Sequence, residues 1–487
     1  MTLAIILLYL ALVLAIGALS HRLFRGTGED FFLASRTIGP FLLLMSLFGT
    51  HMTAFSLLGA SGEAYHHGVG VFALLASSSA LVVPLAFLFL APRIWRLGER
   101  HGYLTQVEFL RDRWQSDALG LLLFVVMVAL LVPYLLIGIK GGGITLAQIT
   151  EGATPEWVGS VLMSVVVLSY VSIGGLRGTA WANTFQTLVF MTLGAATFLL
   201  ITRKMGGLGA AMNRIGESAP DLLARSGHVE PLQLLTYMAI PLSVGMFPHI
   251  FMHWLTAKSE RSFRLPIVAY PVCVAIVWIP SVVLGILGNL DFPGLEGPQA
   301  NSVLVMMIAK YAPGAMAGML AAGVFAAVMS SLDSQVLSLS TMFTRDIVRH
   351  YGFADQLGDR RTVLFGRVFV GAIFTVALGL ALRVDRSLFK LGVWCFTGFA
   401  ALTPVIVAAL YWKRSTKAGA FAAVLTTAVL WIFYFGKGWN APGYTVLGMG
   451  IMPVAVILVA SSLAMVIGSL ATTPPSETHL ARFFEAE

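Results

Sequence analysis

Residues 324–337 read Val-Phe-Ala-Ala-Val-Met-Ser-Ser-Leu-Asp-Ser-Gln-Val-Leu, a polar cluster inside an apolar segment. Four small residues of this cluster are spaced i, i+3, i+4 and i+7 and share one face of a helix: Ala327, Ser330, Ser331 and Ser334. Asp333 lies in the same turn. A carboxylate near the bilayer centre costs about 2.5–3.5 kcal/mol on insertion scales, so it normally has a partner or lines a water-filled cavity.

Two interpretations of this cluster are open. Hydroxyl groups, a carboxylate and freed carbonyl groups are the oxygen ligands that a small hard cation prefers, which predicts one side of a sodium site. Alternatively, the serines are small residues that allow close helix packing or that bond back to their own carbonyl groups. The acid in the same turn favours the cation site.

Composition sets the class of protein. Of the 487 residues, 57% are hydrophobic and only 11% are charged, and the mean hydropathy is +0.85. This composition excludes a soluble globular protein and predicts an all-α polytopic membrane protein. The net charge of +8 does not indicate a nucleic-acid partner, because the basic residues concentrate in short loops between apolar segments. Cys273 and Cys395 lie in separate apolar segments, so no disulfide framework is expected.

About thirteen apolar segments are long enough to cross a membrane. With the N-terminus outside and the C-terminus inside, roughly two-thirds of all Lys and Arg fall in inner connections, as the positive-inside rule requires. The first segment has no basic residue ahead of it, which favours an uncleaved span over a signal peptide. We therefore expect a multi-pass protein of the cell (inner or plasma) membrane.

Two of these spans are interrupted at their centres. One contains Phe48-Gly49-Thr50-His51-Met52-Thr53 and the other Val244-Gly245-Met246-Phe247-Pro248-His249. Such breaks free backbone groups, which is tolerated at membrane depth only beside a cavity or an ion. The two spans are five apart, and an odd number of spans inverts the second block of the chain relative to the first. Broken helices at matching positions of two inverted halves indicate the midplane site of a secondary transporter.

Four motifs occur in order and in register with the spans: Asp30-Phe-Phe-Leu-Ala-Ser-Arg36, Gly174–Gln186, Ala326–Gln335 and Leu410–Ala420. They resemble signatures of the sodium:solute symporter family, which includes proline, pantothenate, monocarboxylate, sialate and sugar transporters. The resemblance implies a LeuT-like core of two inverted five-helix repeats with extra spans at both ends.

This resemblance also implies how the chain is divided. Residues 1–37 would form an extra N-terminal span and an inner loop, and 38–202 the first repeat. Residues 203–230 would form an outer loop and 231–411 the second repeat. The remaining residues, 412–487, would hold two extra spans and a cytoplasmic tail.

Carried over residue by residue, the family's central sodium site takes ligands from the broken second span and the ninth span. Its implied carbonyl ligands are Gly49, Met52 and Ala327, and its implied hydroxyl ligands are Ser330 and Ser331. Sodium is therefore the expected coupling ion. Because any residue type supplies a carbonyl group, the assignment of Gly49 and Met52 rests on the resemblance more than on side-chain chemistry.

Two departures from the family pattern bear on a second cation site. Asn183 stands where relatives often carry an acid, and Asp333 where they usually carry Ser or Thr. One hypothesis is that the negative charge has moved between helices and keeps a second cation site, with the residues Asn183, Ser330, Asp333 and Ser334. A second is that Asp333 only makes a charge-assisted hydrogen bond to an amide such as Asn183. A third is that Asp333 takes up a proton, since burial favours its neutral form.

The solute is expected at the two breaks and in the neighbouring spans. The candidate lining residues are Thr50, His51, Thr53, Phe55, Ser56, Ser77, Met246, His249, Trp394 and Thr397. This lining has too few polar groups for a sugar, because each sugar hydroxyl needs a partner. A monocarboxylate or a small amino acid fits better. Lys140 is either the counter-charge of such a solute or a side chain that snorkels to the outer surface. His51 donates to a carboxylate of the solute, acts as a pH-sensitive gate, or packs as a structural histidine bonded to a carbonyl group.

Together these features predict sodium-coupled uptake of a small organic solute by alternating access, with membrane lipid as the surroundings. Neither nucleic acid nor an obligate protein partner is expected. A proton-coupled symporter of the same fold and a solute sensor without transport are the alternatives. An enzyme is not expected, because no nucleophile, base and oxyanion set occurs at membrane depth.

Overall fold

The computed structural model describes residues 2–22, 36–224, 229–441 and 443–484, which are helical with short connections. Most of the predicted motif at 30–36 lies outside the described residues. Two isolated bridges, Ile38 with Ala257 and Val446 with Ile451, are the β contacts in this part of the chain. The all-α class predicted from composition is confirmed.

The helices fall into a long set and a short set. The long helices are α1 (Thr2–Arg22), α9 (Asp117–Ile149), α10 (Glu156–Lys204), α14 (Arg264–Asp291), α16 (Ala315–Met342), α17 (Phe353–Ala381), α18 (Leu388–Ala401), α20 (Lys417–Trp439) and α21 (Pro453–Leu470). The short ones are α3 (Pro40–His51), η2 (Phe55–Gly59), α4 (Ala60–His67), α5 (Gly70–Phe72), η3 (Ala73–Ser77), α6 (Ser78–Phe89), α7 (Ala91–His101), α8 (Gln106–Trp114), α11 (Leu208–Ser218), η4 (Pro220–Leu223), α12 (Pro231–Tyr237), η5 (Ile240–Gly245), α13 (Pro248–Leu255), η6 (Glu260–Phe263), η7 (Gly297–Ser302), α15 (Val303–Tyr311), η8 (Phe343–Arg349), α19 (Thr403–Tyr411) and α22 (Glu477–Phe484).

Many of these helices are long and apolar enough to cross a membrane. Within the described ranges, 9 helical stretches meet that test, and 2 bent pairs raise the number to 11. Two shorter apolar helices, Thr2–Ile16 and Glu156–Val171, accompany them. A multi-pass protein is therefore confirmed, whereas the number of thirteen spans and the outside N-terminus stay predictions.

Both predicted interruptions are confirmed. The axis turns by 63° between Pro40–His51 and Phe55–His67, and by 52° between Pro231–Gly245 and Pro248–Leu255. At the first break Met52 leaves the helix in an extended conformation. At the second break Phe247 is extended because it precedes Pro248, whose ring disfavours helical geometry in the residue before it.

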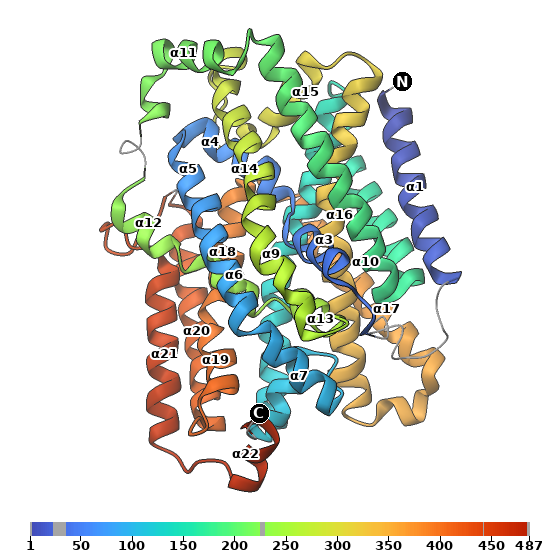
Figure 1. Ribbon diagram of the computed structural model, residues 1–487, viewed down its shortest axis with the longest axis vertical. Coiled ribbons are helices and arrows are strands. Elements are labelled where there is room, and N and C mark those ends of the chain that lie inside the picture. The colour runs from blue at the N-terminus through green and yellow to red at the C-terminus, as the bar shows by residue number, and fades with distance from the viewer. Residues whose placement is uncertain (1, 23–35, 225–228, 442, 485–487) are drawn as a thin grey trace.

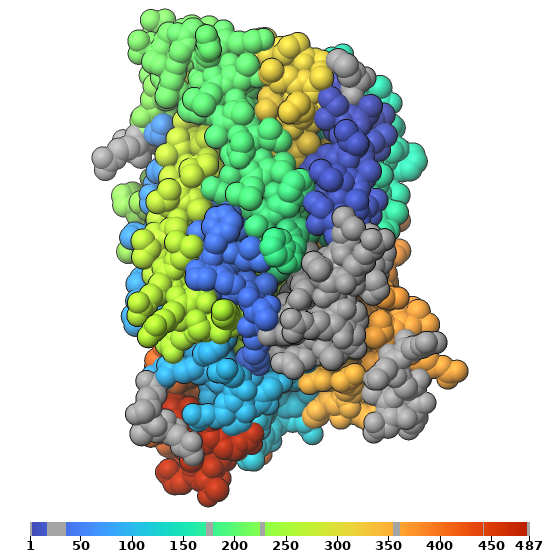
Figure 2. Space-filling view, turned by 45° about the vertical axis from the view of Figure 1, so that its right-hand side comes forward, coloured from blue at the N-terminus to red at the C-terminus, as the bar shows by residue number. Residues whose placement is uncertain are grey.

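The polar helix α16 lies in the middle of the bundle. It packs against α10, α9, α1, α3 and α13, and every residue from 321 to 339 is buried. Figure 1 shows α1 at one edge of the bundle and α20 and α21 at the opposite edge, and Figure 2 shows α1 on the outside. The two termini lie at opposite ends of the molecule (Figure 1). At the C-terminal end, Arg482 of α22 contacts His101 of α7 and Asp112 of α8.

Candidate functional site

The broken helix α3 and the polar helix α16 meet through their backbone and a serine. Ser330 Oγ lies 2.7 Å from the Gly49 carbonyl oxygen and 3.0 Å from that of Ala327, and it donates to this pair. Thr50 Oγ1 donates in return to the Ser330 carbonyl oxygen at 3.3 Å. Ser330 therefore lies within hydrogen-bonding distance of two other predicted sodium ligands, one of which, Gly49, is far away in the chain.

The other two predicted ligands lie nearby with different partners. Ser331 Oγ donates to the carbonyl oxygen of Val328 at 3.1 Å, within its own helix. Met52 is fully buried at the break, and its N–H donates to the Phe48 carbonyl oxygen at 3.0 Å. The Met52 N–H therefore closes the last turn of α3.

Gly49 allows α3 to approach α10 closely. A Cβ atom at this position would lie 2.0 Å from Thr187 Oγ1 and 3.2 Å from the Asn183 carbonyl oxygen. Thr187 is itself held by a hydrogen bond of 2.9 Å to the Met45 carbonyl oxygen. A side chain at residue 49 would push α3 away from the position in which its carbonyl group faces Ser330.

The buried carboxylate of Asp333 has several polar neighbours. The hydroxyl of Tyr170 donates to Oδ2 at 2.8 Å, and that of Ser334 donates to Oδ1 at 3.2 Å. In the amide orientation that satisfies both of its polar atoms, Asn183 donates to each carboxylate oxygen at 2.9 Å. The oxygen of the same amide then lies 2.8 Å from Ser334 Oγ and 3.3 Å from Thr50 Oγ1, as an alternative acceptor for either hydroxyl. The cluster therefore joins α3, α10 and α16 around one buried carboxyl group.

His253 extends this cluster into the second broken helix. Its Nε2 lies 3.2 Å from Ser334 Oγ and its Nδ1 lies 3.0 Å from Ser46 Oγ. Sequence reasoning missed both His253 and Tyr170. No spacing in the sequence relates either residue to Asp333, which lies on another helix.

A second group of side chains, distinct from the cluster around Asp333, lies at the second break. His249 is buried, and neither of its ring nitrogens has a hydrogen-bond partner among the described residues. The same holds, over the described ranges, for the hydroxyls of Thr53 and Tyr134. The ring of His249 stacks on Phe247 with centroids 5.1 Å apart and lies 5.6 Å from that of Tyr134. Phe396 closes this group edge-on to Tyr134 at 5.0 Å.

Unpaired buried polar groups cost free energy, about 1–3 kcal/mol each in mutational series. His249 and Tyr134 bring such groups into one aromatic cluster, which is typical of a ligand site. Helix α13 also begins here, at Pro248, and no side chain caps its first turn. Its N-terminal N–H groups carry a partial positive charge that favours an anion.

The remaining candidates are scattered. His51 and Tyr270 share a hydrogen bond, and Phe55 stacks on Phe389 at 5.2 Å. Ser56 is buried beside the break, and the sulfur of Met246 accepts a hydrogen bond from Gln106 at 3.1 Å.

Three predicted residues and Lys140 do not join the group at the breaks. Ser77 is exposed on the surface, and Trp394 and Thr397 line a separate cavity. The ammonium group of Lys140 donates to the Val384 carbonyl oxygen and lies 3.5 Å from Oδ1 of Asp385.

Comparisons with known proteins point to one family. The model described as "Sodium:solute symporter family" matches residues 31–427. Similar relatives are the sodium/pantothenate symporter of Escherichia coli (strain K12), 26% identical with 97% of each chain covered, and the sodium/proline symporter of the same organism, 25% identical with 94% of this chain and 91% of the relative covered. These relatives are transporters.

Similar solved structures have the LeuT fold. A Na+-coupled sialic acid symporter in a substrate-bound outward-open state has a TM-score of 0.78 at 18% identity, with 98% of this chain and 99% of that chain covered. Mhp1, a nucleobase-cation-symport-1 family transporter, has a TM-score of 0.60 at 14% identity, with 94% and 98% covered. At these identities the likeness concerns the fold alone.

Proposed function

Because the chain belongs to the sodium:solute symporter family, we propose that it couples sodium movement into the cell to uptake of a small organic carboxylate. A monocarboxylate or a small amino acid is the favoured solute. The observation that carries the proposal is the contact of 2.7 Å between Ser330 Oγ and the Gly49 carbonyl oxygen. It joins a broken helix to the polar helix at the centre of the bundle.

Sodium would bind between α3 and α16. The carbonyl oxygens of Gly49 and Ala327 and the hydroxyl oxygen of Ser330 already face one another, and a hard cation prefers such oxygen ligands. A rotation of the Ser330 hydroxyl turns its lone pairs toward the ion. Met52 and Ser331 complete the proposed ligand set. Because the ligands come from two helices, a bound ion stabilises the arrangement in which both are in contact.

Asp333 would supply the charge of a second cation site. Its carboxylate lies among Asn183, Ser330 and Ser334, which offer further oxygen ligands. The hydrogen bonds from Tyr170 and Asn183 also support the alternative in which the charge is satisfied without an ion. Proton uptake by Asp333 would instead couple transport to protons.

The solute would bind in the aromatic enclosure beside the breaks. His249, Thr53 and Tyr134 bring unpaired polar groups, and the first turn of α13 brings uncapped N–H groups. These groups favour the carboxylate of the solute, whereas the rings of Phe247 and Phe396 favour an apolar body. The remaining candidates are Thr50, His51, Phe55 and Ser56 around the first break and Met246 at the second, and they would surround the solute further out.

Uptake into proteoliposomes tests this proposal. We expect a labelled monocarboxylate or small amino acid to accumulate under an imposed sodium gradient and not under a proton gradient. The Ser330→Ala variant should need at least about tenfold more sodium, since bonds to charged groups contribute about 1.5–3 kcal/mol. Ser338→Ala is the matched control, because the Ser338 hydroxyl bonds within its own helix at 2.8 Å.

Each alternative has its own outcome. Uptake driven by a proton gradient alone would overturn sodium coupling and support the proton-coupled symporter. Saturable binding of the solute without any flux would support the sensor. Equal sodium dependence in Ser330→Ala and Ser338→Ala would remove Ser330 from the sodium site.

A further inference from the structure

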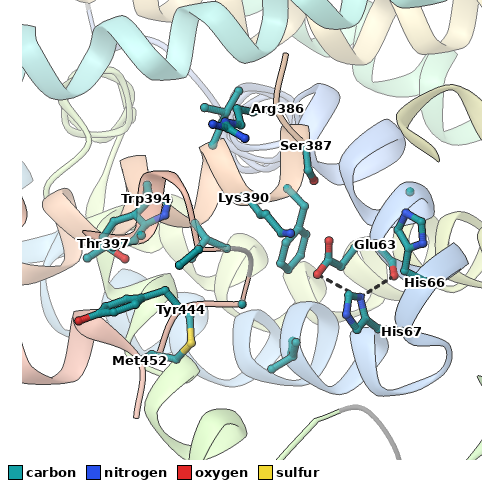
Figure 3. Close-up of a pocket in the computed structure, with 18 of the residues that line it drawn as sticks. Glu63, His66, His67, Arg386, Ser387, Lys390, Trp394, Thr397, Tyr444 and Met452 are labelled. Atoms are coloured by element: carbon teal, nitrogen blue, oxygen red, sulfur yellow. Dashed lines mark hydrogen bonds and ion pairs between the residues drawn. The ribbon is translucent and has the colours of Figure 1, made fainter. Parts of the chain in front are cut away.

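A cavity separate from the helix breaks opens at the end of the bundle where α4 ends and α18 begins. We call it the outer pocket, after the predicted orientation; its volume is about 220 Å³. The lining residues labelled in Figure 3 form three groups. Glu63, His66 and His67 lie on one side, Trp394, Thr397, Tyr444 and Met452 on the other, and Arg386, Ser387 and Lys390 between them. Tyr444 and Met452 come from the segment that joins the helices α20 and α21, outside the ten-helix core.

Two buried donors of the pocket lining lack partners. Tyr237 and Asn301 are each only 2% exposed, and both line the pocket. The Tyr237 hydroxyl and the Asn301 Nδ2 have no hydrogen-bond partner in the described part of the chain. The Leu388 N–H donates to Asn301 Oδ1 at 3.2 Å and thereby fixes the amide with its NH₂ group unused. Such groups are costly unless a ligand satisfies them.

Two cations offer further donors. The guanidinium of Arg386 lies 5.0 Å from the ring centroid of Trp439 and gives one hydrogen bond, to Asn440 Oδ1 at 3.3 Å. An Arg side chain has five donors, so several stay available. Lys390 interacts electrostatically with Glu63 and donates no hydrogen bond to any residue that the structure describes. Its ammonium group is therefore open to an added anion.

The charge of the lining favours an anionic ligand. Arg386 and Lys390 contribute two positive charges against the single carboxylate of Glu63, which leaves one positive charge with neutral histidines. The Glu63 carboxylate oxygen Oε1 also lies 3.2 Å from His67 Nδ1. The aromatic and apolar side of the pocket, formed by Trp394, Tyr444 and Met452, suits an apolar body.

Stacked aromatic rings connect the lining of the outer pocket to the first break. Phe389 lines the pocket and stacks on Phe55, which follows the first break, with centroids 5.2 Å apart. On its other side Phe389 stacks on Tyr237 at 6.3 Å. A molecule in the outer pocket therefore has a set of contacts that the aromatic enclosure around His249 does not share.

We propose that the outer pocket is a second binding site, which takes a small organic carboxylate with an apolar or aromatic body. Lys390, Arg386, Tyr237 and Asn301 bind its carboxylate, and Trp394 with Met452 packs against its body. The site is built partly from helices outside the two repeats. It is filled independently of sodium and of the site at the breaks, so the proposal does not depend on transport.

Benzoate binding to the purified full-length chain tests this proposal, with calorimetry or ligand-observed NMR as the readout and neutral benzamide as the companion probe. We expect saturable binding of benzoate without sodium and at least about tenfold weaker binding of benzamide, since charge-assisted bonds are roughly twice as strong as neutral ones. Lys390→Gln and Arg386→Gln should each weaken benzoate binding by about tenfold. Arg383→Gln, on the same connection but outside the pocket lining, is the matched control and should bind as the parent does.

Two further variants keep the test decisive. Tyr237→Phe removes one hydroxyl group, leaves the aromatic stack intact and should weaken benzoate binding even if the charge variants fail to fold. His249→Phe alters the site at the breaks and should leave benzoate binding unchanged. The proposal is overturned if benzoate does not saturate, if Arg383→Gln weakens binding as much as Lys390→Gln, or if His249→Phe abolishes binding while the pocket variants do not.

Discussion

The hydroxyl of Tyr170 donates a hydrogen bond of 2.8 Å to Oδ2 of Asp333, across the contact between α10 and α16. The carboxylate is fully buried, and Ser334 and the amide of Asn183 are its other partners. A buried charge is tolerated only where such partners or an ion compensate for lost water. Substitutions between acid and amide in this cluster can therefore test how many ions the protein transports with each solute.

The first prediction concerns the position of the charge. If Asp333 binds a second sodium ion, sodium-dependent uptake has a Hill slope above one, and Asp333→Asn lowers it toward one. The double variant Asn183→Asp with Asp333→Asn returns the charge to α10 and should recover the slope, because the net charge of the site is restored. Uptake measured against sodium concentration checks this. A slope of one that Asp333→Asn leaves unchanged contradicts the second sodium ion.

The second prediction compares two buried histidines of α13. His249 has no partner for either ring nitrogen within the described residues, whereas both nitrogens of His253 have one. His249→Phe should therefore raise the Tm of the ligand-free protein while it weakens solute binding, since an unpaired polar group costs about 1–3 kcal/mol. His253→Phe should lower the Tm, because it leaves Ser46 and Ser334 without that partner. Thermal unfolding of the purified variants measures both, and a lower Tm in His249→Phe would argue against a ligand site there.

The third prediction concerns the approach of α3 to α10. A Cβ atom at Gly49 would lie 2.0 Å from Thr187 Oγ1, so Gly49→Ala should destabilise the protein by about 1–3 kcal/mol and abolish uptake. Thr187→Ala removes that atom and should partly rescue Gly49→Ala. Thr187→Val keeps a methyl group near the same position and should not. Rescue by both variants, measured by folded yield and Tm, would mean that the clash is not the cause.

The fourth prediction concerns the docking of α22. The guanidinium of Arg482 contacts both carboxylate oxygens of Asp112, at 2.9 and 3.2 Å, and Phe483 packs near Phe109 and Arg113. The Arg482 pair is half-exposed, and such pairs contribute only about 0–1 kcal/mol. Arg482→Gln should therefore change little, whereas Phe483→Ala should release the helix. Limited proteolysis before residue 477 reports the difference, and faster cleavage in Arg482→Gln than in Phe483→Ala would reverse the assignment.

The same Asp112 is also bound by Tyr103, whose hydroxyl donates to Oδ2 at 2.5 Å. Burial, followed by the Asp112 hydrogen bond and charge, raises the pKa of Tyr103. The phenol therefore stays protonated and keeps its hydrogen bond to Asp112 through the neutral range.

Much of this organisation follows from local patterns. Apolar runs predicted a multi-pass helical protein, and glycine or proline beside polar residues predicted both breaks, since backbone geometry is limited by the residues nearest in the chain. The spacing of Ala327 and Ser330 predicted a shared helix face. The pairing of Asp333 with Asn183 was one of three interpretations, and the contact exists at 2.9 Å.

The sequence by itself therefore determined the class of protein, the two breaks and the polar face of α16, because hydropathy and helical period act over a few residues. The tertiary structure alone decided which distant groups meet, such as Tyr170 with Asp333 and Tyr134 with His249, and it brought Tyr237 and Asn301 into the lining of one pocket. Such meetings depend on how whole helices pack, and a single tyrosine or asparagine in an apolar span carries no periodic signal for its partner. It also placed Trp394 and Thr397 in the lining of the outer pocket, whose Phe389 stacks on Phe55 beside the first break.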